Sequence, residues 1–240
     1  VIADYAYAGD LQGNMWRFDL VTTPTPTTPV RTDPFLQSAI GTIAASTFKV
    51  SYGGSPLYSA IDGRMSGATR QPISAPPSLV RHPSGLGYLV IFGTGKYFET
   101  GDGTADTSRA LTLYGIWDKA TKGTLTSTPS PALTRANLVA QTIDLEPVNT
   151  FAANAAVDGI RILSQNSVDW TTMKGWRLDL KVATAGNAGE MLINPMSIRG
   201  QSLLLSTITP NSDPCSDGVG SWQYAIDPYT GGRTKFNVFD

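Results

Sequence analysis

The segment YAGDLQGNMWRFDL, residues 7–20, has the clearest structural pattern in the chain. Apolar residues run into a Gly-Asp turn, and a second turn at Gly13 begins a short strand that places Trp16 and Phe18 on one face. Alternating apolar and polar residues between turn residues are typical of strands that are buried on one side. The segment therefore predicts two short strands joined by a tight connection.

Related phrases recur along the chain, and each combines a tryptophan, alternating apolar residues and an aspartate. They are LYGIWDKATKG (113–123), GWRLDL (175–180) and SWQYAIDPYTGG (221–232). Short β-rich runs bounded by Gly, Pro, Asn or Asp fill most of the chain from residue 47 onward. We interpret the phrases as markers of successive blades of an all-β, modified, quinoprotein-like β-propeller, and the strands suffice for about three to four blades.

Particular side chains of these phrases have expected structural roles. The four tryptophans of the repeat are expected in the core between blades, whereas Trp170 lies outside the repeat and is the aromatic residue expected to be exposed. Aspartates beside the strands are expected to accept backbone N–H groups and cap turns. These aspartates are Asp10, Asp19, Asp118, Asp179 and Asp227.

One segment interrupts the strand pattern. Residues 21–34, VTTPTPTTPVRTDP, hold four prolines, which prevent a helix or a central strand. We interpret residues 21–46 as an insertion between blades of one propeller domain that spans residues 1–240; a PxxP-type partner ligand is the alternative. Because the chain opens in mid-pattern at Val1, we expect it to be a portion of a longer polypeptide.

Composition narrows the class of protein. Charged residues make up 15% of the chain, and 24 glycines and 16 prolines favour an all-β extracellular module over a helical cytosolic enzyme. The net charge of −1, without a cluster of Lys and Arg, argues against a nucleic-acid partner. The longest apolar runs are too short to span a bilayer. Cys215 is the only cysteine, so an internal disulfide is excluded, and a buried free thiol or a partner elsewhere in the precursor remains.

The sequence offers little that is typical of an active site. His82 is the only histidine, and no Gly-x-Ser-x-Gly turn accompanies it, so we expect no enzymatic activity. Two other functions fit a Trp-rich propeller: a quinoprotein-type dehydrogenase, and a carbohydrate-binding lectin that would use Trp170. The best internal metal candidate is the loop from Glu99 to Asp106, where Asp102 and Asp106 could bind calcium; a solvated loop between strands is the alternative.

The order of six phrases resembles the C-terminal propeller of the PilY family, the tip-associated adhesin and biogenesis proteins of bacterial type IV pili. The phrases are AGDLQGNMWRFDL, QPISAPPSLVRHP, VIFGTGKYFETGD, LYGIWDK, GWRLDL and TITPNSDPC followed by SWQYAIDPYTGGR. The resemblance implies a propeller of seven blades, of which this chain covers the C-terminal portion. It also implies control of pilus extension and retraction, twitching motility and surface attachment.

The resemblance implies a calcium site at the start of the chain. In that family an aspartate loop immediately precedes the AGD phrase, and its last acidic ligand matches Asp4. The other ligands would lie before Val1, and calcium would regulate the intact protein. The implied partners are pilins or minor pilins, with host or abiotic surfaces as attachment targets. The implied locations are the periplasm, the outer membrane and the pilus tip outside the cell.

Overall fold

The computed structural model describes residues 5–20, 48–119, 133–146, 159–213, 215 and 219–236. Within these ranges the secondary structure is thirteen β-strands and three short 3₁₀ helices, so the predicted all-β class is confirmed. No helix in the described ranges has the length and apolar character needed to cross a lipid bilayer. The predicted insertion at 21–46 and the predicted ligand Asp4 both lie outside the described residues.

The first sheet is built around strand β2, which contains the segment that opens the sequence pattern. β2 pairs antiparallel with β1 from Met15 to Asp19, and its two ends pair with β3 and β4. The β1–β2 connection is the predicted tight turn, with Gly13 at a φ of 79°, a left-handed value that favours glycine. The strands are β1 (Tyr5–Gly9), β2 (Asn14–Asp19), β3 (Lys49–Val50) and β4 (Tyr58–Ser59).

The second sheet has six strands in the order β5-β6-β7-β10-β8-β9. β10 lies between β7 and β8, antiparallel to the first and parallel to the second, so strands that are adjacent in the sheet are not consecutive in the chain. The strands are β5 (Ser78–Arg81), β6 (Tyr88–Gly93), β7 (Thr112–Asp118), β8 (Val139–Leu145), β9 (Ile162–Leu163) and β10 (Gly175–Val182).

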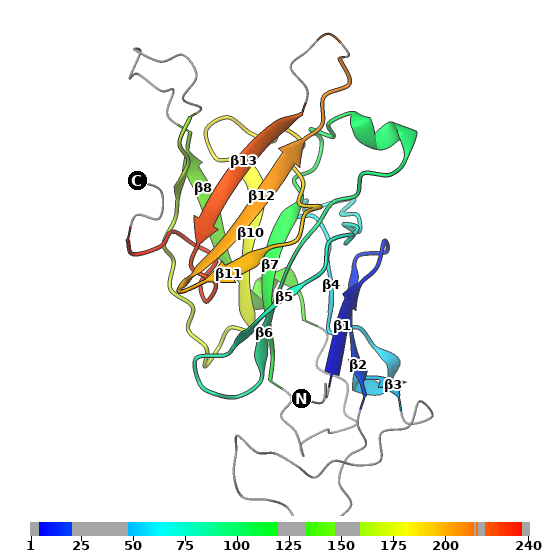
Figure 1. Ribbon diagram of the computed structural model, residues 1–240, viewed down its shortest axis with the longest axis vertical. Helices are drawn as coiled ribbons and strands as arrows, with labels where there is room; N and C mark the ends of the chain where they lie inside the picture. The colour runs from blue at the N-terminus through cyan, green and yellow to red at the C-terminus, as the bar shows by residue number, and fades with distance from the viewer. Residues whose placement is uncertain are drawn as a thin grey trace, which may run out of the picture.

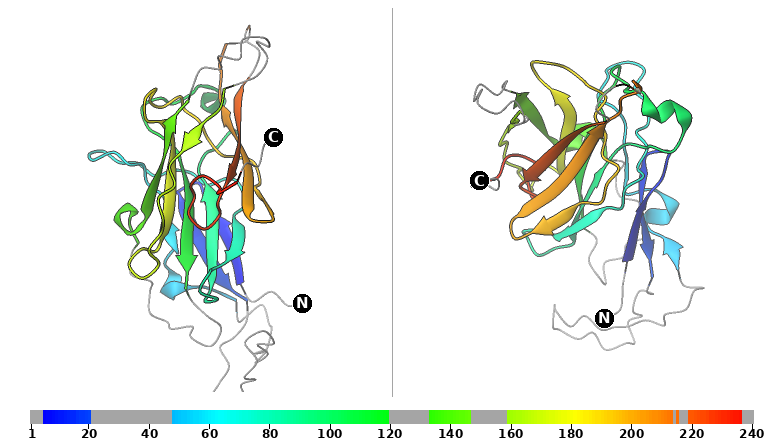
Figure 2. Two further views of the ribbon diagram at one scale, coloured as in Figure 1. Left: turned by 90° about the vertical axis from the view of Figure 1, so that its left-hand side faces the viewer. Right: turned by 45° about the horizontal axis from the view of Figure 1, so that its top comes forward.

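The third sheet is an antiparallel meander of β11 (Ser197–Arg199), β12 (Ser202–Thr209) and β13 (Gly220–Ile226). Figures 1 and 2 show the three sheets side by side, with the six-stranded sheet in the middle. The first and third sheets each pack against a face of the six-stranded sheet, as neighbouring blades do in a propeller.

Two hydrophobic cores lie on opposite faces of the second sheet. One core joins it to the first sheet through Met15, Tyr58, Phe92 and Tyr114, all 2% exposed or less. The other core joins it to the third sheet and contains Trp176 together with buried residues of β12 and β13. Successive apolar residues along β6 and β7 point to opposite faces of the second sheet, so these strands contribute side chains to both cores.

The tryptophan phrases do not each mark a separate blade, which corrects the interpretation of the repeat. Trp117 is on β7 and Trp176 is on β10, and these strands are direct neighbours, with Trp176 opposite Gly115. The physical reason is that β8 and β9 belong to the same sheet and β10 then inserts between β7 and β8. Trp117 and Trp176 are buried as expected, whereas Trp16 and Trp222 are half-buried.

Candidate functional site

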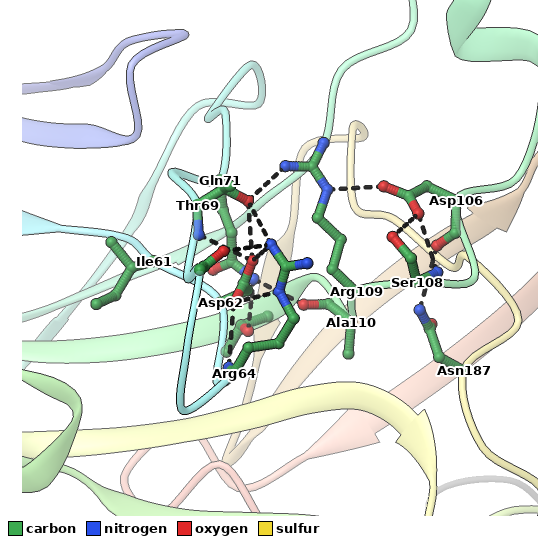
Figure 3. Close-up of polar contacts among 12 residues, drawn as sticks. Ile61, Asp62, Arg64, Thr69, Gln71, Asp106, Ser108, Arg109, Ala110 and Asn187 are labelled. Carbon is green, nitrogen blue, oxygen red and sulfur yellow. Dashed lines mark hydrogen bonds and ion pairs between the residues drawn. The ribbon is translucent and has the colours of Figure 1, made fainter.

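Three connections meet at one end of the sheets and are joined by polar contacts. They are residues 60–77 between β4 and β5, 94–111 between β6 and β7, and 183–196 between β10 and β11. Figure 3 shows the polar contacts that join them. Beside these contacts lies an open pocket of about 220 Å³, whose lining includes two cations and two carboxylates. It is lined by Pro72, Lys96, Gly101, Asp102, Thr104, Asp106, Arg109, Leu111, Gly189 and Met191.

Asp62 organises the first of these connections. Its carboxylate accepts hydrogen bonds from Arg64 Nε and Nη2 at 3.2 and 3.0 Å, and from the backbone and hydroxyl of Thr69 at 3.0 and 2.9 Å. Burial alone would raise the pKa of Asp62, but these hydrogen bonds outweigh it and lower the pKa to about 2. Asp62 is therefore a fixed anion that closes the loop between residues 62 and 69.

Arg109 links the first connection to the second. Its Nη1 donates to Thr69 Oγ1 at 2.7 Å, and its Nε donates to Asp106 Oδ2 at 2.7 Å. Asn187 Nδ2 from the third connection donates to the Asp106 carbonyl at 3.2 Å, as Figure 3 shows. Side chains from three separate loops thus form one connected network, whose chemistry suits binding more than proton transfer.

The two aspartates of the predicted calcium loop line this pocket, but each already has partners. Asp102 accepts from the backbone N–H groups of Phe98 and Glu99, and its Oδ1 lies 3.1 Å from Lys96 Nζ. Asp106 accepts from Ser108 and pairs with Arg109.

Lys96, which also pairs with Glu99, and Arg109 therefore offset two of the three negative charges of this loop. Among the described residues, no three His, Cys, Asp or Glu side chains come together as ligands of one ion. Calcium binding by Asp102 and Asp106 stays a prediction.

The aspartates that were expected to cap turns divide into two groups. Asp10 and Asp227 do so: Asp10 accepts from the backbone N–H of Asn14 at 2.8 Å, and Asp227 accepts from that of Tyr229 at 2.8 Å. The expectation is wrong for the other three, which are Asp19, Asp118 and Asp179. Each of these instead forms an ion pair with an arginine: Asp19 with Arg17 of its own strand, Asp118 with Arg17 of the first sheet, and Asp179 with Arg135 of the turn before β8.

A buried arginine joins the first sheet to the second. Arg17 on β2 pairs with Asp19 at 3.2 Å and with Asp118 on β7 at 2.9 Å, and all three side chains are 3% exposed or less. The guanidinium lies between the rings of Tyr5 and Tyr52, at 4.6 and 4.5 Å from their centroids. This arrangement fixes how the two sheets meet.

The other residues that the sequence singled out, His82, Trp170 and Cys215, do not form a site with one another. His82 is 2% exposed; its ring stacks on Trp117 at 3.9 Å and meets the edge of Trp170 at 4.4 Å. Trp170 is half-buried in this contact rather than freely exposed. Cys215 is an exposed free thiol, not a buried one. Ser84 hydrogen-bonds to His82 Nδ1 at 2.7 Å, but among the described contacts of His82 no carboxylate orients the ring.

Comparison with known proteins decides the family. A family model described as the PilY1 beta-propeller domain matches residues 1–156, which is more than half of the chain. The chain belongs to this family. The resemblance and the propeller fold expected from the sequence are thereby confirmed.

The relatives extend well beyond this chain. It is 56% identical over 245 residues to the "Type IV pilus biogenesis factor PilY1" of Pseudomonas aeruginosa (strain PAO1), covering 100% of this chain and 20% of the relative. A "Type IV pilus biogenesis factor PilY1 homolog" of Xylella fastidiosa is 30% identical over 240 residues, covering 99% of this chain and 14% of the relative. The chain thus spans a fifth or less of the length of these relatives.

A solved structure extends the match to the whole fold. The crystal structure of the Pseudomonas aeruginosa PilY1 C-terminal domain superposes with a TM-score of 0.83 at 53% sequence identity. The superposition covers 100% of this chain and 47% of that chain.

Sequence reasoning missed the buried arginines of this PilY1-family propeller, although a local signal exists. Two tryptophan phrases contain Trp-Arg-x-Asp, in MWRFD and GWRLD. Because side chains two residues apart on a strand share a face, Arg17 and Asp19 lie together, and so do Arg177 and Asp179. The distant partners Asp118 and Arg135 could not be found this way, because sheet packing brings them in.

Proposed function

We propose that this chain is a non-catalytic propeller module of a type IV pilus biogenesis protein. The observation that supports this most strongly is 56% identity to a PilY1 along the full length of the chain. Identity at this level makes the same fold and the same surface connections a sound expectation. The chain spans only part of those relatives, so the activity of the whole protein belongs to the proposal.

The distribution of charged side chains supports a binding role. Most acidic side chains in the described ranges are held by ion pairs or turn hydrogen bonds, as for Asp62, Asp106 and Asp179. A general base needs a group that is free to take a proton from a substrate. A rigid set of sheets with connected loops at one end is instead suited to holding a partner surface.

The proposal also covers motility, attachment and export. The module would help to control pilus extension and retraction, and so twitching motility and surface attachment. Its partners would be pilins or minor pilins, with host or abiotic surfaces as attachment targets. It would act after export, in the periplasm, at the outer membrane or at the pilus tip.

A segment exchange tests the pilus role. In a Pseudomonas aeruginosa strain that lacks PilY1, the matching fifth of PilY1 is replaced by this chain, and the twitching zone and surface pili are measured. We expect both to return to the level given by intact PilY1. A chimera with Gly231→Ala, which strains the fold, serves as the control. A chimera present at the normal level and exported, but without surface pili, would contradict the proposal.

Calcium regulation is proposed at Asp4, with the preceding loop supplied by the longer protein. In the same chimera, Asp4→Asn is expected to weaken calcium affinity, because a carboxylate ligand is lost. The matched control is Asp102→Asn, which removes an anion that Lys96 already neutralises. Calorimetric calcium titration of the purified chimeras measures the effect. If Asp102→Asn reduced the affinity and Asp4→Asn did not, the site would lie in the loop from Glu99 to Asp106.

A further inference from the structure

A buried hydroxyl and a buried side-chain amide meet between two distant parts of the chain. Gln71 belongs to the connection between β4 and β5, and Thr112 is the first residue of β7. Both residues are 0% exposed, and Gln71 Nε2 donates to Thr112 Oγ1 at 3.0 Å. The amide carbon is bonded to Nε2, so a rotation of the amide turns this carbon toward Oγ1. The nucleophile and the electrophile of an acyl transfer are thus held side by side.

A carboxylate orients the hydroxyl. Thr112 Oγ1 donates to Asp179 Oδ1 at 2.8 Å. Asp179 is also held by Arg135 and Arg177 and its side chain is 17% exposed, so an outside substrate does not displace these partners. Thr112 needs no such displacement, because its proton already points at the carboxylate. A proton can therefore leave this hydroxyl within the folded chain.

The oxygen of the Gln71 amide faces a phenol. Tyr114 Oη lies 2.8 Å from Gln71 Oε1, and burial raises the pKa of Tyr114, so the phenol keeps its proton. The Ile61 carbonyl, at 2.9 Å, is the other printed acceptor of this hydroxyl, but it also accepts from Arg135 Nη1 at 3.2 Å. Arg135 Nη1 donates to Tyr114 Oη as well, at 2.9 Å. A donor aimed at an amide oxygen stabilises the negative charge that develops there when the carbon is attacked.

We propose that Thr112 and Gln71 form an intramolecular ester after the chain folds. Thr112 Oγ1 gives its proton to Asp179 Oδ1 and bonds to the amide carbon of Gln71, while Tyr114 stabilises the charge on Oε1. The carbon–nitrogen bond then breaks, Asp179 passes the proton to the departing nitrogen, and ammonia leaves. One C–O bond replaces one C–N bond, and the reaction needs no oxidant, cofactor or second substrate.

The surroundings of the two side chains protect the product. Water that would hydrolyse an ester has no access to Gln71 or Thr112, since both are fully buried. The bond closes a covalent loop between positions 71 and 112 and ties the connection at 60–77 to β7. Resistance to mechanical extension is the expected benefit. That benefit rests on the proposed role in a pilus, whereas the chemistry does not.

Mass spectrometry tests the proposal. The intact mass of the folded, purified chain should lie about 17 Da below the mass of its sequence, because one ammonia is lost. Trypsin should release residues 71–81 and 110–119 as one joined peptide. A free peptide that begins with glutamine can lose ammonia by itself, so the joined peptide is the criterion. An unchanged intact mass, or the two peptides found only apart, would overturn the proposal.

Hydroxylamine identifies the kind of bond. It cleaves an ester and leaves an amide cross-link intact, so the joined peptide should separate into residues 71–81 and 110–119. The first of these should carry a hydroxamate at Gln71. A joined peptide that survives hydroxylamine would refute the ester.

Variants separate the reacting groups from the fold. Thr112→Val removes the nucleophile and should abolish both the loss of mass and the joined peptide, whereas Thr112→Ser should keep both. Tyr114→Phe should slow the reaction by roughly tenfold or more, measured as the cross-linked fraction after short expression. A joined peptide that persists in Thr112→Val would contradict the assignment.

A second buried threonine provides the matched control. Thr207 is 0% exposed and also donates to a carboxylate, that of Glu190, but none of its described contacts is with a side-chain amide. Thr207→Val should therefore leave the loss of about 17 Da unchanged. Disappearance of the joined peptide in this variant would show that the reaction does not depend on Thr112 specifically.

The exported chimera covers the case in which the isolated chain or a variant does not fold. The joined peptide is sought in the PilY1 chimera that carries this chain, after its isolation from the cell surface. Its presence there supports the ester, and its absence overturns it.

Discussion

At the scale of single residues, buried arginines determine how neighbouring sheets meet. Arg17 Nη1 donates to both oxygens of Asp118, and the Tyr7 and Tyr52 hydroxyls donate to the same carboxylate. Desolvating this arginine is costly, so its carboxylates and flanking rings must all be in place. Removal of one partner then costs more than the loss of a surface ion pair.

Asp118→Ala should lower the free energy of unfolding by about 3–5 kcal/mol, because Arg17 loses a buried counter-charge and two tyrosine hydroxyls lose an acceptor. Asp106→Ala is the matched control: its side chain is 48% exposed, and its pair with Arg109 should be worth about 1 kcal/mol or less. Urea unfolding followed by tryptophan fluorescence measures both. Similar losses for the two variants would show that the buried pair has no special weight.

His82 gives stability a dependence on pH. Burial, reinforced by the charge of Lys119, lowers the pKa of His82 below its usual value. Neutral His82 therefore stabilises the fold above about pH 6.5, and this contribution is lost as the pH falls through the lower pKa of the folded state. His82→Phe should lose less stability than the wild type between about pH 7.5 and 5.5, as measured by urea unfolding. Identical pH profiles would rule out this role.

At the scale of elements, a turn after β13 packs on the middle of the second sheet. Trp176 on β10 is fully buried, and its Nε1 donates to the Pro228 carbonyl at 3.0 Å. Gly231 closes the turn with a φ of 72°, and a Cβ there would lie 2.1 Å from the indole ring. Gly115 on β7 borders the same ring, where a Cβ would lie 2.3 Å away. The tryptophan of one phrase and the glycine of the last phrase thus form a single contact.

Gly231→Ala should destabilise the chain by about 2–4 kcal/mol, since the added methyl overlaps Trp176 and the left-handed φ disfavours a side chain. Gly101→Ala provides the comparison: a Cβ at Gly101 meets nothing within 4 Å, and the change should stay within about 0.5 kcal/mol. Calorimetric Tm values give the measurement. A neutral Gly231→Ala would mean that the turn is displaced without cost.

At the scale of the whole molecule, neighbouring sheets share their cores. The core between the first and second sheets contains Met15 and Phe92, and the core between the second and third contains Leu178 and Leu203. Since the second sheet contributes to both, no sheet can lose its packing without exposing apolar surface on another.

We therefore expect the three sheets to unfold together. Hydrogen exchange measured by mass spectrometry at increasing urea should show β2, β6 and β12 losing protection at the same concentration. Earlier loss in β2 would instead identify the first sheet as a separate cooperative unit. The exposed residues 65–68 at the tip of the loop serve as an internal control that exchanges at all concentrations.

The sequence alone determined the class of fold, the turn at Asp10 and the family. These follow from local patterns, because alternation and turn residues act over a few positions. The pair of Arg17 with Asp19 was also within reach, since it lies on one face of one strand.

Only the tertiary structure decided that β10 lies beside β7, that Asp118 and Asp179 bind arginines instead of capping turns, and that Arg135 and Arg177 share one carboxylate. Each of these depends on residues far apart in the chain. Strand order after a long excursion, and the facing of one sheet by another, are set by packing of whole faces and leave no mark in the local sequence.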